Sequence, residues 1–170
     1  DYQEQLGDRV CLGEAQKHLY VAGNVFLVHD PKNGLKYYPL NRFCVKRDYC
    51  GNVLKAITEE SVGFYALPKE VQESIMHTSS DKNIQELEEK ELTLYTGFKR
   101  KENHWEIYQE CEGVEIPNSK GTYPIDICPF MALRYVRIDG ESYGRGLIEE
   151  YIGDLSYLDV LSLAIKQASL

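Results

Sequence analysis

Three glycines, at positions 140, 144 and 146, lie in the stretch RIDGESYGRGLIEEYIGDL, between a strand-like run and a helix-like run. A glycine-rich turn between a strand and a helix is a common phosphate-binding arrangement, because the N–H groups at a helix N-terminus favour an anion. A P-loop needs its last glycine to be followed by Lys and then Ser or Thr. Here Gly146 is followed by Leu147, and the glycine spacing does not fit GxGxxG either. The pattern argues against nucleotide binding.

The same turn has a structural interpretation that needs no ligand. Asp139 and Glu141 place two carboxylates where an anion would bind. Gly140 can adopt the positive φ of a tight turn, and Ser142 is a candidate N-cap of the next helix. Arg145 stands where a capping box has Glu, and we expect it to form ion pairs with carboxylates of its own chain or of a neighbouring one. We therefore predict that the glycines aim the helix.

Other residue types that could support catalysis or metal binding are scattered. The five cysteines lack CxxC spacing, which argues against a zinc site and favours reduced thiols. Glu149, Glu150 and Asp154 lie together near the start of the last predicted helix, where carboxylates could bind magnesium or act as acid and base. Acidic residues in a first turn more commonly complement the helix dipole. We predict no catalytic residues, no metal and no cofactor.

The bulk properties indicate a folded domain. The chain has 170 residues, of which 43% are hydrophobic and 27% charged. Its net charge of −8 argues against a surface whose main role is to grip nucleic acid. No apolar run approaches the roughly 20 residues that cross a bilayer, so we expect no membrane partner. The chain starts with Asp1 and ends at Leu170 inside a predicted helix, and we expect it to be a piece of a longer protein.

The first third of the chain predicts one helix and two hairpins. Apolar residues at helical spacing over 15–22 indicate a helix, and Val25 to Val28 form a short strand-like run. Asn33-Gly34 and Gly51-Asn52 are turn signals with apolar residues on both sides. Pro39 indicates an edge strand, because proline cannot donate a ladder hydrogen bond.

The middle of the chain continues with short elements. A short helix is predicted over 67–76, with proline near its first turn. The polar run 77–91 reads as a surface connection, and 92–113 as another hairpin. The alternating run 128–139 predicts a strand that leads into the glycine turn. Together these elements predict an α+β fold of small antiparallel sheets and hairpins, with an N-terminal helix and a long C-terminal helix.

The last predicted element is a long helix over about 143–170. Its apolar residues recur at three- and four-residue steps, and others lie away from that stripe. About 25 helical residues would reach roughly 37 Å. A helix that is apolar on more than one side needs more partners than a small sheet supplies, so we expect neighbouring subunits to cover it.

Five blocks of the sequence resemble the portal, or head-to-tail connector, proteins of short-tailed phages (podoviruses). The most specific is VRIDGESYGRGLIEEYIGDLSYLDVLSLAI, at 136–165. The others occur in the family's order and spacing: LYVAGNVFLV at 19–28, FCVKRDYCGNVLKAIT at 43–58, ALPKEV at 66–71 and GTYPIDICPFMALRYVR at 121–137. The resemblance covers roughly residue 17 to the end of the chain.

This resemblance implies a subunit of a homo-oligomeric ring, dodecameric in the family, at one vertex of the virion capsid. Double-stranded DNA would pass through the ring during packaging and ejection. Residues 1–140 would form the wing region, with its helix and hairpins, and 141–170 the start of the stem helix. The full-length protein would meet the terminase, the scaffold or capsid proteins and a tail adaptor, after assembly in the host cytoplasm. ATP hydrolysis belongs to the terminase in this family, so no enzymatic activity is implied.

Two alternatives remain beside this interpretation: a nucleotide-binding enzyme that uses the 140–146 loop, and a generic adaptor or scaffold module. The residues predicted to act in structure or assembly come from the turn and from the last helix. They are Arg137, Asp139, Gly140, Glu141, Ser142, Tyr143, Gly144, Arg145, Glu149, Asp154, Leu155 and Leu158.

Overall fold

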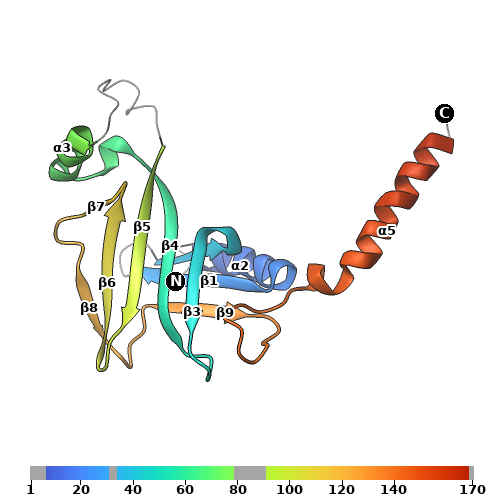
Figure 1. Cartoon of the computed structure of the whole chain (residues 1–170), viewed down its shortest axis with the longest axis horizontal. Coiled ribbons are helices and arrows are strands. Elements are labelled where there is room, and N and C mark those ends of the chain that lie inside the picture. Colours follow the sequence, from blue (N-terminus) through green and yellow to red (C-terminus); the bar gives the residue numbers. More distant parts are fainter. Residues whose placement is uncertain (1–6, 31–33, 79–90, 169–170) are drawn as a thin grey trace.

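The fold consists of two antiparallel sheets, a helix packed on the smaller sheet, and a long helix that projects from the body (Figure 1). The computed structural model describes residues 7–30, 34–78 and 91–168. The predicted α+β class is confirmed, with a helix near the start of the described chain and a long helix at its end.

The smaller sheet has three strands in the order β2-β1-β9. They are β1 (Asn24–Asp30), β2 (Gly34–Pro39) and β9 (Phe130–Arg134). The first strand after helix α2 (Asp8–Ala22) lies in the centre of this sheet because it is apolar on both faces. Pro39 lies on an edge strand, as predicted.

The larger sheet has six strands, with β3-β4-β5-β6-β7 in order and β8 also paired to β6. Hairpins join β3 to β4 and β5 to β6, as the turn signals predicted. The bounds are β3 (Phe43–Arg47), β4 (Val53–Gly63), β5 (Glu91–Arg100), β6 (His104–Cys111), β7 (Val114–Glu115) and β8 (Gly121–Pro124).

An aromatic core joins the two sheets. Phe26 of β1 stacks on Phe130 of β9 at a centroid separation of 5.0 Å, and Trp105 of β6 meets Phe130 edge-on at 4.9 Å. Phe98 of β5 lies 5.8 Å from Phe26. Because these rings come from both sheets, the sheets fold as one unit, and the single tryptophan reports on their junction.

A second core lies at the far end of the larger sheet, beneath the short helix α3 (Lys69–Thr78). Val71 and Ile75 of this helix pack with Leu92 and Cys111. Pro68 directly precedes the helix, as predicted. Two 3-10 turns complete the described elements: η1 (Leu40–Arg42) and η2 (Phe64–Ala66).

Two predicted boundaries near the glycine turn are wrong. The strand predicted over 128–139 ends at Arg134, and the helix predicted from about Tyr143 begins at Leu147 as α5 (Leu147–Ala168). Ser142 therefore does not cap this helix. The predicted connection over 77–91 falls mostly outside the described residues, as does part of the turn before Gly34 and the end of the chain beyond Ala168.

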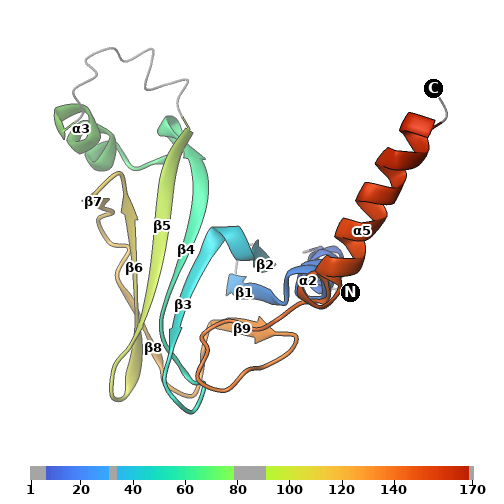
Figure 2. The same ribbon diagram turned by 45° about the vertical axis from the view of Figure 1, so that its right-hand side comes forward.

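Helix α5 leaves the body beside the end of α2 and points away from both sheets (Figures 1 and 2). Within its described length, Leu147–Ala168, no side chain is buried. Neither α5 nor any other helix in the described ranges has the length and apolarity that a bilayer crossing requires. This exposure agrees with the prediction that the apolar surface of α5 requires a partner other than its own sheets.

Candidate assembly site at the glycine-rich turn

The turn between β9 and α5 is a closed loop. The backbone N–H of Arg145 donates to the carbonyl of Val136 at 3.0 Å, and the N–H of Val136 donates back to the carbonyl of Arg145 at 3.2 Å. Gly140 lies at the tip of this loop with φ of 82°, as the sequence predicted. The loop therefore returns the chain to the level of β9 before α5 begins.

Glycines bring the returning chain into contact with the C-terminus of α2. A Cβ on Gly146 would collide with the backbone of Val21 and Gly23, and a Cβ on Gly23 would collide with the backbone of Arg145. A Cβ on Gly144 would lie 2.7 Å from the carbonyl oxygen of Val136. These contacts leave no room for a side chain, so the glycines are needed for the close approach of two backbones.

A buried asparagine fastens this contact. The Asn24 side chain, 3% exposed, accepts a hydrogen bond from the N–H of Gly144 at 2.7 Å and donates one to the carbonyl of Gly144 at 2.8 Å. The N–H of Tyr135 adds a bond to the carbonyl of Gly23 at 2.9 Å. The start of α5 is thus held to the junction between α2 and β1, 120 residues earlier in the chain.

The same bonds answer whether the turn could hold a phosphate. A phosphate cradle needs unoccupied backbone N–H groups. Here the N–H groups of Gly144, Arg145 and Glu141 are bonded to Asn24, Val136 and the carbonyl of residue 138. Because these donors are already used within the chain, the geometry favours a structural turn.

Three arginines fasten the outer part of the loop to β9 and to the β3–β4 turn. Arg47 donates to the carbonyls of Ser142, Gly51 and Ala132 at 3.0, 2.8 and 2.8 Å. Arg134 donates to the carbonyl of residue 141 at 2.9 Å, and Arg137 to that of residue 50 at 3.1 Å. Burial lowers the pKa of Arg47, and the positive charges of the other two arginines lower it further.

Ser142 and Tyr143 contact β3 instead of starting a helix. The Ser142 hydroxyl accepts a hydrogen bond from the N–H of Arg47 at 3.3 Å, and the Tyr143 hydroxyl accepts one from the N–H of Val45 at 3.0 Å. The Tyr143 ring lies 6.2 Å from that of Phe43, and burial raises the pKa of its hydroxyl. These contacts hold the residues before Gly144 against β3, which explains the late start of α5.

The charged residues of the turn form exposed ion pairs. Arg145 pairs with Glu141 at 3.0 Å and with Glu149 in the first turn of α5. Arg137 pairs with Asp139 at 3.3 Å. Glu149 and Glu141 both raise the pKa of Arg145, and the hydrogen bond to Glu149 has the largest effect. The predicted pairing of Arg145 within its own chain is confirmed, but exposed pairs of this kind contribute little to stability.

The remaining predicted residues, Asp154, Leu155 and Leu158, lie on the exposed surface of α5. They belong to none of the three hydrophobic clusters of the described residues. The exposed large apolar side chains of α5 share this position outside the body. They are Ile148, Tyr151, Ile152, Leu155, Tyr157, Leu158, Val160, Leu161, Leu163 and Ile165.

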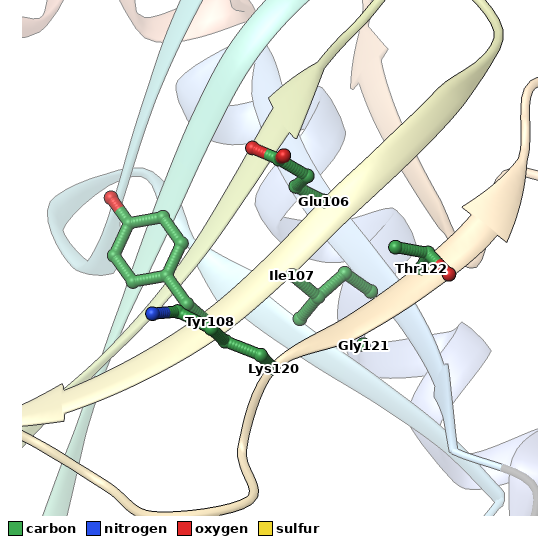
Figure 3. Close-up of a pocket in the computed structure, with 6 residues that line it drawn as sticks. All are labelled: Glu106, Ile107, Tyr108, Lys120, Gly121 and Thr122. Carbon is green, nitrogen blue, oxygen red and sulfur yellow. The ribbon is translucent and has the colours of Figure 1, made fainter.

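A surface pocket elsewhere offers little chemistry. It has a volume of about 450 Å³ and lies on β6 and β8 (Figure 3). Its lining includes one carboxylate, Glu106, and one ammonium group, Lys120. Within residues 7–30, 34–78 and 91–168, no group of three His, Cys, Asp or Glu side chains is arranged to hold a metal ion. The five cysteines are free thiols.

Sequence reasoning missed three residues that build the site. Asn24 follows the predicted break after α2, but its partner Gly144 is too far along the chain for a local pattern to reveal. Arg47 and Arg134 lie in strands, where alternating charged residues normally indicate a solvated face. Their hydrogen bonds to carbonyls of the loop became visible only in the folded chain.

The sequence matches a family model described as bacteriophage head to tail connecting protein, over residues 6–170. Because this match spans nearly the whole chain, the chain belongs to that family. The resemblance inferred from the five sequence blocks is confirmed.

Individual relatives agree with this assignment. The chain is 41% identical over 177 residues to the portal protein of Escherichia phage T7, and 40% identical over 176 residues to that of Enterobacteria phage T3. Each alignment covers 100% of this chain and 32% of the relative. The portal protein of Pseudomonas phage phiKMV is 30% identical over 156 residues, which are 89% of this chain and 30% of the relative. The chain therefore spans about a third of the length of these relatives.

Proposed function

We propose that the full-length protein carrying this sequence is the subunit of a portal ring at one vertex of the capsid, through which double-stranded DNA is packaged and ejected. The observation that supports this most is the exposure of α5, which buries no side chain within Leu147–Ala168 although it carries ten large apolar ones. An apolar surface of this kind marks a protein–protein contact. Family membership makes copies of the same chain the natural partner.

We propose different roles for the two parts of the fold. Residues 1–140 would form the wing, and 141–170 the start of the stem. The turn at 134–146 supports this division, because it fixes the direction in which α5 leaves the sheets. In this proposal Arg137, Asp139, Gly140, Glu141, Ser142, Tyr143, Gly144 and Arg145 orient the helix, while Glu149, Asp154, Leu155 and Leu158 face neighbouring subunits.

The charge of the chain suits a DNA conduit. A net charge of −8 lowers the attraction for phosphates that would otherwise slow the passage of DNA and make it depend on salt. We further propose, from the family, a dodecameric ring, assembled in the host cytoplasm, whose remaining regions meet the terminase, the capsid or scaffold and the tail. This part of the chain has a structural role, and we propose no catalytic activity for it.

Electron microscopy of the purified full-length protein tests this proposal. We expect closed rings with a central channel, and a monodisperse monomer would contradict the proposal. Arg145→Glu should impair ring assembly more than it destabilises the fold, because Arg145 lies just before α5 and its ion pairs are exposed. A normal yield of rings from this variant would show that Arg145 is not needed for assembly.

The nucleotide-binding alternative is tested in the same preparation. Titration with ATP or GTP and magnesium should give no binding at micromolar concentrations, because the N–H groups of Glu141, Gly144 and Arg145 are bonded within the chain. Micromolar binding that Gly144→Val abolishes would instead support a nucleotide site at 140–146.

A further inference from the structure

Helix α2 covers only part of the smaller sheet. Its Ala15 and Leu19 pack on Val25 and Leu27 of β1, and Leu35 and Tyr37 of β2 join the same cluster. A helix is about 10 Å wide and neighbouring strands are about 4.8 Å apart, so one helix covers about two strands. The third strand, β9, is left without a helix above it.

The side chains of β9 that face the α2 side form an apolar shelf. Met131 and Leu133 lie opposite Leu27 and Val25 in the strand pairing, and therefore point to the face that α2 covers. Yet Met131 is 53% exposed and Leu133 is 36% exposed. Tyr135 continues the same alternation, and its ring meets that of Tyr20 of α2 edge-on at 5.3 Å. We call Tyr20, Met131, Leu133 and Tyr135 the β9 shelf.

The chain's own α5 does not cover this shelf. Gly146 is packed against the C-terminus of α2, and from there α5 runs away from the body (Figures 1 and 2). The side chains from Ile148 onward are exposed. The shelf and α5 are thus two apolar surfaces of one chain that cannot meet within that chain.

The first half of α5 carries a surface that matches the shelf. Ile148, Tyr151, Ile152 and Leu155 recur at helical spacing and form one stripe. The seven residue steps of this stripe measure about 10 Å, and the four strand steps from residue 131 to 135 measure about 13 Å. The two surfaces therefore have similar lengths.

The charged groups beside the two surfaces already have partners within the chain. Arg134 points to the other face of β9, where it donates to the carbonyl of residue 141, and Arg137 pairs with Asp139. On α5, Glu149 pairs with Arg145. The shelf and the stripe are thus matched by their apolar side chains, and their contact would remove both from water.

We propose that the β9 shelf receives the first half of α5 from a second copy of this chain. The contact joins two different surfaces, so each copy offers a helix to one neighbour and a shelf to the other. Contacts of this head-to-tail type close into a ring when the rotation between neighbouring copies divides a full turn. The inference rests on the proposed ring, and it names one pair of surfaces in the ring interface.

Disulfide cross-linking in the full-length protein tests this contact. Met131→Cys and Ile152→Cys replace exposed side chains, 53% and 58% accessible. They are made separately, after the accessible native cysteines have been changed to serine, and the two proteins are then assembled together and oxidised. We expect covalent dimers on a non-reducing gel only in the mixture. In a random equal mixture, about a quarter of the contacts pair a shelf from the Met131→Cys variant with a helix from the Ile152→Cys variant.

The double variant, with both cysteines in one chain, should give a ladder of covalent oligomers that a reductant removes. A matched control combines Ile152→Cys with Tyr65→Cys, which lies in η2 beside the second core and is 69% exposed. This control should form rings without the ladder. A ladder of equal strength in the control would overturn the proposed pairing.

The remaining outcomes separate this inference from the proposed function. Rings seen by electron microscopy without cross-links in the mixture or the double variant would overturn the contact and leave the portal ring intact. A disulfide within single chains of the double variant would show that α5 reaches its own shelf, which also overturns it. Failure of the wild-type protein to form any ring would overturn the proposed function and the inference together.

Discussion

Asn24→Ala should destabilise the fold more than any exposed polar substitution, because it removes both hydrogen bonds to Gly144. The N–H and the carbonyl of Gly144 would then be buried without partners. Each such group costs about 1 to 3 kcal/mol, so we expect a loss of about 2 to 6 kcal/mol in the free energy of unfolding. Domains of this size have about 5 to 15 kcal/mol in total.

Urea unfolding followed by tryptophan fluorescence measures this loss. Trp105 is the single tryptophan and lies in the aromatic core between the two sheets. With a slope of about 2 kcal/mol per molar urea, a loss of 3 kcal/mol lowers the midpoint by about 1.5 M. Asn41→Ala, at an exposed asparagine of η1, is the matched control and should leave the midpoint unchanged.

Limited trypsin digestion adds a local readout. If Asn24 fastens the start of α5, its loss should speed cleavage after Arg145 more than cleavage elsewhere in the chain. A midpoint for Asn24→Ala equal to that of Asn41→Ala, with unchanged cleavage at Arg145, would refute the view that this asparagine holds the turn.

Three further predictions concern the turn, the helix and the core. Gly146→Ala should lower the free energy of unfolding, measured by urea titration, by about 1 to 3 kcal/mol, because the new Cβ meets the α2 backbone. Gly153→Ala, which has open space around it, should instead raise the free energy of unfolding by up to about 1 kcal/mol. Leu158→Asp should abolish rings in electron micrographs while the unfolding midpoint stays within error, and normal rings would contradict this. Burial, followed by the hydrogen bond to Glu60, raises the pKa of the Tyr38 hydroxyl. The stability that the protonated Tyr38 contributes is therefore present below pH about 10 and falls above it by about 1.4 kcal/mol per pH unit. Tyr38→Phe should reduce this slope in unfolding measurements across that pH range.

The elements of the fold were largely predictable because their signals are local. The turn residues at Gly51-Asn52 and the alternating apolar residues beside them specify the β3–β4 hairpin without reference to the rest of the chain. The same holds for the helix before Gly23 and for the edge position of Pro39. In each case the residues that determine the structure lie within a few positions of one another.

The start of α5 was not predictable in the same way. The predicted helix runs through Tyr143 to Gly146, although Gly144 and Gly146 are unfavourable residues inside a helix. Tertiary contacts decide otherwise, since Tyr143 packs beside β3 and Gly144 is bonded to Asn24. The partners of these residues lie about 100 residues away in the sequence, so no local pattern contains them.

The role of the glycines shows the same division. Their position between a strand and a helix suggested a bend, and the positive φ of Gly140 confirms it. The close approach of Gly146 to the end of α2 depends on where another helix ends in space. Sequence reasoning could reject the phosphate site from the missing lysine. The structure adds a physical reason, because the N–H groups of Glu141, Gly144 and Arg145 are bonded within the chain.

Native mass spectrometry of the full-length protein tests most directly whether α5 is an assembly element. Wild type is compared with a variant carrying Leu155→Asp and Leu158→Asp, two exposed positions whose substitution leaves the sheets untouched. We predict a single closed oligomer for wild type and a folded monomer for the variant. A variant that assembles to the same mass as wild type would contradict the assignment of α5 to the contact between subunits.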